Sequence, residues 1–152
     1  MNGVIFVGAV LLLFFGVGTV SASGVTPEDN SVQGMIRRVA GERGQSAALM
    51  LAFAKRESNF NAMAQNPSDP SFGLFGIEPA WLTYFGYSPD TWQLMDGPFS
   101  ASLACDIIFY FQNKGFVFPS QADIYNVGET LWAKGVRNVA YRDAIIAAYH
   151  NF

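Results

Sequence analysis

The sequence predicts a mainly α-helical domain with little or no β-sheet, preceded by an apolar N-terminal helix. Three observations support this prediction. Apolar residues recur at helical spacing in several segments from residue 31 onward. One of these segments is apolar on nearly all sides, as is typical of a helix at the centre of a domain. Prolines stand near the starts of the expected helices and glycines near their ends, where each residue is favoured.

The first two helices follow from apolar spacing and capping residues. Apolar side chains at positions 32, 35, 36 and 39 fall on one helix face, and Gly41 and Gly44 bracket the end of that helix. Ser46 is a suitable N-cap for a second helix over residues 47–58, because its hydroxyl can accept a hydrogen bond from the first turn. The second helix is apolar nearly all round through Ala54, so we expect it to be central and buried.

A stretch in the middle of the chain is expected to be non-helical. Residues 65–70 (QNPSDP) are rich in Asn and Pro, which indicates a turn or loop. Residues 71–77 (SFGLFGI) place two glycines among large apolar residues, which predicts a tight extended turn or a short strand. The remaining expected helices cover residues 79–85, 89–95, 98–114, 128–134 and 138–149.

Composition excludes several classes of function. Of the 152 residues, 51% are apolar and 14% charged, so the chain as a whole is expected to fold. The net charge of −3 argues against nucleic acid as the main partner, because a phosphate backbone attracts clustered Lys and Arg. A zinc site needs three or four ligands, and the single cysteine, Cys105, and the single histidine, His150, cannot supply them. We therefore expect no metal and no cofactor.

Residues 1–22 contain an uncharged apolar run, VIFVGAVLLLFFGVGTV, over positions 4–20. Its length lies between the core of a signal peptide and a full membrane span. Small residues up to Ala22 suit signal peptidase, and residues 23–30 have the composition of a polar linker. The sequence predicts a signal peptide or a membrane anchor over 1–22, a linker over 23–30 and a globular domain over 31–152. It leaves open whether the first segment is cleaved.

Glu57 lies at the end of the predicted apolar helix. Burial disfavours a charged carboxylate, and so does the negative end of the helix dipole, so both effects should raise the pKa of Glu57. A carboxyl that stays protonated near neutral pH is what a general acid requires. The alternative is that Glu57 pairs with Lys55, Arg56 or solvent at a frayed helix end, and this feature alone favours that alternative.

Four short motifs occur in order along the chain. They are AKRESNF at residues 54–60, SFGLFGI at 71–77, IYNVG at 124–128 and YRDAI at 141–145. They resemble the A-x-x-E-S-x-F, S-x-G-L-x-Q-I, A-Y-N-x-G and Y-x-x-x-V/I motifs of the soluble lytic transglycosylase family, relatives of goose-type lysozyme. The resemblance runs from about residue 33 to residue 149 and implies a lysozyme-like helical fold.

The resemblance also implies an activity. Members of the family cleave peptidoglycan between N-acetylmuramic acid and N-acetylglucosamine with a single catalytic glutamate, which Glu57 matches. Glu57 would protonate the glycosidic oxygen and then take the proton of the muramoyl 6-hydroxyl, giving a 1,6-anhydro product. The residues that match substrate-binding or positioning positions of the family are Ser58, Ser71, Gly73, Tyr125 and Asn126.

Each of these positions is given a role by the resemblance. Ser58 would help to hold the catalytic carboxyl or the sugar, and Ser71 and Gly73 would shape the saccharide groove. Tyr125 and Asn126 would orient the carboxyl and the N-acetyl group of the substrate. Each has a structural alternative: Tyr125 as a core aromatic residue, Asn126 as a turn or capping residue, and Ser71 as the cap of a turn.

The sequence departs from the family pattern at two positions. Gly76 stands where the family has Gln, so one substrate-facing amide is missing, and Ile124 stands where Ala is usual, which affects packing.

A second carboxylate could take part in the reaction, and Asp69 and Glu78 are the nearest candidates in the sequence. Both can be explained otherwise, Asp69 as a turn residue before a proline and Glu78 as a surface residue. Most of the aromatic residues after the second motif are expected to belong to the core: Trp81, Tyr84, Phe85, Tyr87 and Trp92.

Three functions remain open on this evidence. The favoured one is a lytic transglycosylase that uses the substrate's N-acetyl group as internal nucleophile. The others are a hydrolytic muramidase of the same fold and a non-catalytic, glycan-binding, membrane-anchored component of a phage virion or secretion machine. The expected partners are peptidoglycan glycan strands, the membrane through the N-terminal segment, and phage or secretion-machine proteins. The expected location is the cell envelope, in the periplasm, anchored to the membrane or on a virion.

Overall fold

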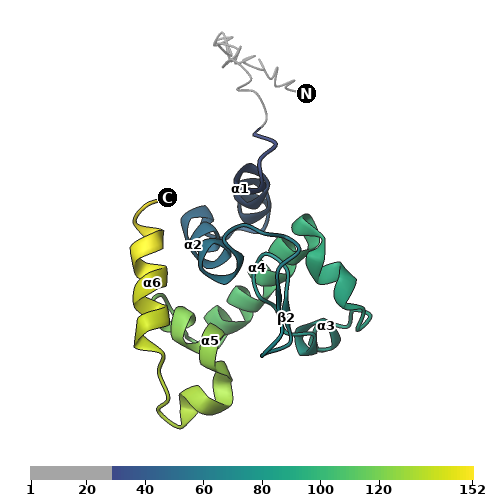
Figure 1. Cartoon of the computed structure of the whole chain (residues 1–152). Helices are drawn as coiled ribbons and strands as arrows, with labels where there is room; N and C mark the ends of the chain where they lie inside the picture. Colours follow the sequence, from purple (N-terminus) through teal and green to yellow (C-terminus); the bar gives the residue numbers. More distant parts are fainter. Residues whose placement is uncertain (1–28) are drawn as a thin grey trace, which may run out of the picture.

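Helix α2, Ala47–Ser58, lies at the centre of the structure, surrounded by other helices (Figure 1). The computed structural model describes residues 29–152, and in this range every side chain from position 49 to position 54 is buried. Helices α1 (Val32–Glu42), α4 (Gly97–Asn113) and α6 (Val139–Tyr149) pack against α2. The prediction of a central, buried second helix is therefore confirmed.

Most helices begin at a residue whose side chain accepts a hydrogen bond from the first turn. The Ser46 hydroxyl accepts from the Leu49 amide at 3.3 Å, and the Asn138 side chain accepts from the Tyr141 amide at 3.0 Å. Helix α4 starts in the same way at Asp96 and carries a proline in its first turn, as expected. Residues next to each helix in the sequence therefore set where α2 and α6 begin. These two helices carry residues of the site described below.

A short hairpin follows α2. Strands β1 (Gln65–Asn66) and β2 (Ser71–Phe72) are antiparallel, and Ile77 returns to pair with Phe72. Positions 73 and 76 of the intervening turn have φ of +77° and +55°, which glycine adopts without steric cost. The expected turn over residues 71–77 is confirmed, and the hairpin lies beside the C-terminal end of α2.

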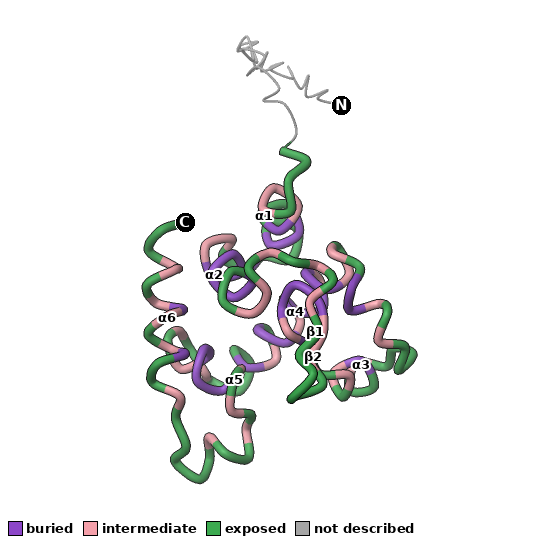
Figure 2. The backbone as a smooth tube through the Cα atoms, viewed as in Figure 1, coloured by how far each residue is buried: buried purple, intermediate pink, exposed green. Residues whose placement is uncertain are grey.

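The buried residues of the core lie mostly on the stretches of the helices nearest the middle of the domain (Figure 2). Its largest fully buried members include Phe53 of α2, Phe75 of the turn and Phe111 of α4. Truncating one such phenylalanine to alanine typically costs about 3–5 kcal/mol. The same buried cluster includes Tyr141 and Ile145 of α6, so the last helix belongs to the core and does not merely cover it.

The later part of the chain differs from the prediction in three respects. Helix α5 spans Ser120–Ala133, whereas the sequence predicted a helix only from Gly128. The buried face of its first half includes the polar residues Gln121 and Asp123, which hid the helical pattern. Gly128 has non-helical backbone angles and kinks α5. The segment Thr91–Met95 is a 3₁₀-helix, and α3, Ala80–Tyr84, is short.

The aromatic residues after the hairpin are also less buried than predicted. Trp92 is 67% exposed and Tyr84 is 59% exposed, and Tyr87 is exposed as well. Only Trp81 and Phe85 pack against the core, as partly buried side chains. Some of these aromatic side chains therefore belong to the core, and others are exposed on the surface of the domain.

The predicted signal or anchor over residues 1–22 and nearly all of the linker over 23–30 lie outside the described residues, so both stay predictions. None of the helices between residues 29 and 152 has the length and hydropathy of a membrane span. The mainly helical fold class is confirmed, with one two-stranded sheet in the part of the chain that the structure describes.

The cap of the central helix gives a direct test of this fold. Ser46→Ala removes the hydroxyl that bonds the Leu49 amide and should lower the free energy of unfolding by about 1 kcal/mol, measured by urea denaturation. Ser120→Ala is the matched control, because Ser120 begins α5 without a side-chain cap bond and should change stability by less than about 0.5 kcal/mol. Equal losses in both variants would contradict the capping role.

Candidate active site

Glu57 lies in the last turn of α2, where the chain bends sharply away. Asn59 and Phe60 follow with φ of +52° and +66°, and the Asn59 amide donates to the carbonyls of the last turn. Positive φ is uncommon outside glycine and costs free energy at a bulky residue such as Phe60. The bend leaves the Glu57 side chain half-buried between α2, the 71–77 turn and α6.

Both oxygens of the Glu57 carboxyl are in close contact with other elements. The Tyr141 hydroxyl of α6 donates a hydrogen bond to Oε1. On the other side, Gly76 approaches so closely that a Cβ atom at position 76 would lie 2.6 Å from Oε2. The carboxyl is therefore held between a tyrosine hydroxyl and bare backbone.

Burial raises the pKa of Glu57 above its ordinary value, and desolvation is the largest cause. The negative charge of Asp69 also raises this pKa, whereas the hydrogen bond from Tyr141 and the positive charge of Arg56 lower it. Burial as the cause of a raised pKa agrees with the expectation from sequence. The protonated acid is thus favoured relative to an exposed glutamate.

The neighbouring cations do not form the frayed-end ion pairs that the sequence left open. Among the described residues, Lys55 donates a hydrogen bond to the Asn59 side chain, and the Arg56 guanidinium lies over the Tyr141 ring at 5.2 Å from its centre. Arg56 therefore contacts the partner of the Glu57 carboxyl and acts on the carboxyl itself through its charge.

Ser58 connects the end of α2 to the 71–77 turn. Its hydroxyl lies 2.9 Å from the carbonyl oxygen of Leu74 and 3.2 Å from that of Ala54. The resemblance implied that Ser58 holds the carboxyl or the sugar. In the structure Ser58 holds the turn that carries Gly76, and its expected role towards the carboxyl or the sugar stays a prediction.

Ser71 and Gly73 are placed in the hairpin. Gly73 is buried, and a Cβ atom there would lie 1.8 Å from the carbonyl oxygen of Leu94, so close packing requires glycine at this position. Ser71 is half-buried in β2 opposite Asn66. Neither residue lines the pocket beside Glu57, so the structure gives both a structural setting, and their expected role in shaping the groove stays a prediction.

Tyr125 of α5 reaches the same turn from the other side. Its hydroxyl donates to the Phe75 carbonyl at 2.8 Å, and its ring packs on Phe53 with centroids 4.6 Å apart. Burial raises the pKa of Tyr125 well above its ordinary value, and the charge of Glu57 adds to the effect. Tyr125 is therefore a neutral group close to Glu57, although it bonds the turn and not the carboxyl.

Asn126 is exposed, and its side-chain oxygen accepts a hydrogen bond from the Asn138 side chain at 2.8 Å. This contact joins α5 to the start of α6. Asn126 also lines the pocket described next. Direct orientation of Glu57 by Asn126 does not occur in the structure, and contact with a substrate N-acetyl group stays a prediction.

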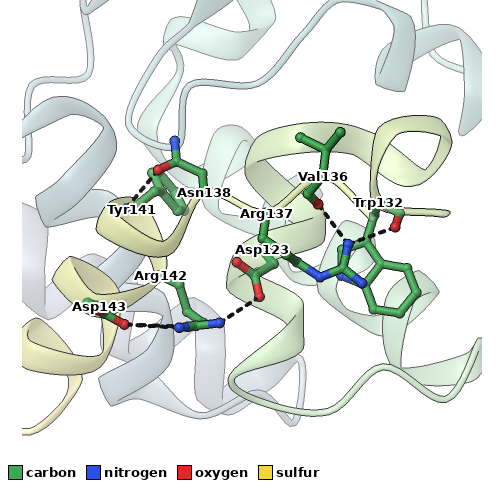
Figure 3. Close-up of polar contacts among 8 residues, drawn as sticks. All are labelled: Asp123, Trp132, Val136, Arg137, Asn138, Tyr141, Arg142 and Asp143. Atoms are coloured by element: carbon green, nitrogen blue, oxygen red, sulfur yellow. Dashed lines mark hydrogen bonds and ion pairs between the residues drawn. The ribbon is translucent and has the colours of Figure 1, made fainter. Parts of the chain in front are cut away.

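Tyr141 is the residue that sequence reasoning missed. It stands in the YRDAI motif, but no role was assigned to it. The side chain is 3% exposed and bonds Glu57 from 84 positions away in the chain. The available signal was its place at the start of a helix in the fourth motif. Figure 3 shows Tyr141 in the first turn of α6, below its cap Asn138.

A pocket of about 340 Å³ opens next to this cluster. Glu57 itself is not among its lining residues, but Gly76, which touches the carboxyl, and Tyr125 are. A wall of the pocket is formed by the aromatic side chains of Trp81, Tyr84 and Tyr110, which pack against one another. The pocket is thus partly aromatic and ends close to a carboxyl whose pKa is raised, which suits a ligand with both apolar faces and polar edges.

The pocket also contains two acidic residues. Glu78 is an exposed lining residue, and Glu129 forms an ion pair with Lys114, the residue that follows α4. Asp69, the other candidate second carboxylate, is exposed in the hairpin loop and is near enough for its charge to affect Glu57. Within residues 29–152, no group of three His, Cys, Asp or Glu side chains is arranged to hold a metal ion.

The raised pKa of Glu57 predicts a stabilising substitution. Above that pKa the folded protein must ionise a partly desolvated carboxyl, whereas below the pKa of the unfolded chain no such cost exists. Glu57→Gln should therefore raise Tm by about 2–8 °C at about pH 7, and the gain should shrink towards zero at about pH 4, measured by calorimetry. Glu78→Gln, at an exposed carboxyl, should leave Tm unchanged at both pH values.

The close approach of Gly76 gives a second prediction. Gly76→Ala should push the carboxyl out of its position, so the pKa of Glu57, followed by carboxyl NMR, should fall towards its ordinary value as desolvation is relieved. Gly44→Ala is the matched control. Position 44 has a similar φ of +66° with nothing within 4 Å, so it should cost comparable backbone strain and leave the pKa of Glu57 unchanged. The same pKa in both variants would contradict the contact.

Comparison with known proteins supports the fold. No protein-family model and no curated protein matches the chain. Among solved structures, it is similar to an inactive mutant of the lytic transglycosylase Slt from Pseudomonas aeruginosa, with a TM-score of 0.52 and 21% sequence identity. The match covers 81% of this chain and 21% of that one, so this chain spans about a fifth of the length of its neighbour. The chain therefore has a lysozyme-like helical fold similar to that of a lytic transglycosylase.

Proposed function

We propose that this protein is a peptidoglycan lytic transglycosylase and that Glu57 is its single catalytic acid and base. One observation carries the proposal. A carboxyl with a raised pKa is held by Tyr141 against the bare backbone of Gly76, next to a partly aromatic pocket. The fold similarity to Slt supports the same assignment, and that neighbour was solved as an inactive mutant in which a glutamate is replaced by glutamine.

The proposed reaction uses Glu57 twice. The protonated carboxyl donates its proton to the glycosidic oxygen, the bond from that oxygen to the anomeric carbon of N-acetylmuramic acid breaks, and N-acetylglucosamine leaves. The substrate's N-acetyl oxygen stabilises the positive anomeric carbon as internal nucleophile. The carboxylate then takes the proton of the muramoyl 6-hydroxyl, and that oxygen closes the 1,6-anhydro ring. Glu57 ends protonated, and no water is consumed.

The surrounding residues support this cycle in distinct ways. Desolvation favours the protonated acid at the start, and the hydrogen bond from Tyr141 stabilises the carboxylate that forms after proton transfer. Ser58 and Tyr125 bind carbonyls of the 71–77 turn, so they fix the backbone against which the carboxyl rests. Asn126 lines the pocket, where it is proposed to contact the N-acetyl group.

The pocket fits the proposed substrate class. Its volume of about 340 Å³ lies within the range of small-molecule sites, and the wall formed by Trp81, Tyr84 and Tyr110 offers apolar ring faces to a sugar. The Gln of the family motif is absent at Gly76, so the carboxyl is approached by backbone where the family has an amide side chain. Affinity for one sugar unit is therefore expected to rest more heavily on the aromatic wall.

One observation favours a second candidate, the hydrolytic muramidase. The charge of Asp69 helps to raise the pKa of Glu57, so Asp69 is the carboxylate that this second candidate would use to activate water. That enzyme would give a reducing-end muramic acid, one water heavier than the anhydro product. The non-catalytic, glycan-binding alternative predicts binding without either product.

The proposed setting is the cell envelope. An apolar segment over residues 4–20 would bring the protein to or across the membrane, and a small wall-opening domain suits a phage virion or a secretion machine. On this proposal the partners are peptidoglycan strands, the membrane, and proteins of that assembly. Nucleic acid is not among the proposed partners.

Mass spectrometry of digested peptidoglycan tests the proposal. The full-length chain should release 1,6-anhydromuropeptides from murein sacculi, and Glu57→Gln should reduce the rate by about 10²- to 10⁴-fold because the acid and base are lost. Asp69→Asn is the control that separates the two enzymes: it should retain the anhydro product, whereas a muramidase would lose its reducing-end product. Sacculus binding with no soluble product from the wild-type chain would favour the non-catalytic alternative.

A further inference from the structure

Helices α5 and α6 each bring one tyrosine to the Glu57 region. Tyr125 of α5 bonds the turn that carries Gly76, and Tyr141 of α6 bonds the carboxyl itself. The two helices are joined by the 134–138 segment and pack against each other. The relative position of α5 and α6 therefore determines whether both tyrosines can reach their partners at the same time.

Asp123 is a buried carboxylate at the contact between these helices. It is 4% exposed, and its Oδ2 lies 3.4 Å from a terminal nitrogen of Arg142 on α6. Its Oδ1 has no hydrogen-bond partner among the described residues. The Arg142 guanidinium also faces the exposed Asp143 at 3.4 Å. Figure 3 shows Arg142 lying between the two carboxylates, with Asp123 reaching it from α5.

Each residue of the ion pair lies within two positions of one of these tyrosines. Asp123 precedes Tyr125 by two residues on α5, and Arg142 directly follows Tyr141 on α6. A second link lies one turn away, where Asn138 donates to the Asn126 side chain and caps the Tyr141 amide. The contacts between α5 and α6 thus lie close to the residues that face Glu57.

Stability alone is a weak reason for such a pair. Burying an aspartate costs desolvation free energy that one partly exposed arginine at 3.4 Å offsets only in part, and apolar residues would pack equally well. What the pair adds is a specific arrangement, because a carboxylate and a guanidinium attract each other strongly in one relative position of the helices.

We propose that Asp123 and Arg142 are positioning residues: their ion pair holds α6 against α5 so that the Tyr141 hydroxyl reaches Glu57 while Tyr125 keeps the 71–77 turn in place. Its catalytic consequence rests on the proposed function, whereas the positioning itself does not. Neither residue lines the pocket, so each acts through the tyrosine of its own helix, Tyr125 on α5 or Tyr141 on α6.

The groups around Glu57 determine what the loss of the pair would do. Arg56 faces the carboxyl from α2, Asp69 from the hairpin loop, Tyr125 from α5 and Tyr141 from α6. Among them, the Tyr141 hydrogen bond and the Arg56 charge favour the carboxylate. If α6 moves and that hydrogen bond weakens while Glu57 stays buried, the pKa of Glu57 rises further.

The test compares the pKa of Glu57 in the full-length chain and its variants by carboxyl NMR. Asp123→Asn should raise this pKa in the same direction as Tyr141→Phe, and Arg142→Lys, which keeps the charge, should raise it less. Asp106→Asn is the matched control, because it breaks the 3.0 Å Arg43–Asp106 pair between the end of α1 and α4. That variant should leave the pKa of Glu57 unchanged, because neither Arg43 nor Asp106 is among the groups that affect the Glu57 carboxyl.

Kinetics on murein provide the second readout. Asp123→Asn should lower kcat by about 10- to 100-fold, as expected for a misplaced reacting group, with KM changed by less than about 2-fold. The basic limb of the kcat–pH profile should move to higher pH. An unchanged pKa of Glu57 in Asp123→Asn, as is expected for Asp106→Asn, would overturn the proposal. If Asp123→Asn does not fold, the same measurement on Arg142→Lys decides it. A wild-type chain that releases no product refutes the proposed function, while the NMR comparison still decides the positioning.

Discussion

The enclosed carboxyl of Glu57 is the constraint on which the surrounding structure depends. Water would solvate its charge better than this site does, so the folded protein keeps a group that opposes its own stability at neutral pH. Three elements are needed to hold it there: α2 supplies the residue, α6 supplies the Tyr141 hydroxyl, and the 71–77 turn supplies backbone. Each of these elements is fixed by contacts that do not involve the carboxyl.

The backbone around Glu57 also adopts a conformation that costs free energy. Phe60 adopts positive φ directly after α2, and Gly73 and Gly76 are confined by close contacts to Leu94 and to Glu57. These features bring the hairpin back against the end of α2. Buried aromatic packing of Phe53, Phe75 and Tyr125 offsets the strain, so the turn is held from the core side while its other side faces the pocket.

The arrangement of α5 and α6 links this local geometry to the rest of the domain. Tyr125 and Tyr141 come from different helices, yet burial raises the pKa of both, and both lie close enough to Glu57 for its charge to add to this effect. Neutral tyrosines at these positions can donate hydrogen bonds without adding charge to the site. A shift of α6 relative to α5 would change both contacts together. The position of α6 therefore affects the pKa of Glu57, although Glu57 itself belongs to α2.

Features that depend on neighbouring residues could be predicted from the amino-acid sequence. The all-apolar pattern of α2, its Ser46 cap and the glycines of the 71–77 turn predict a buried helix that ends in an acid beside a tight turn. Two long-range contacts could not be predicted in this way: Tyr141, 84 positions away, bonds Glu57, and Asn126 pairs with Asn138. Long-range contacts depend on how whole helices pack, and no local pattern records that packing. The buried polar face of α5 hid even its start for this reason, because Asp123 meets its partner Arg142 only after folding.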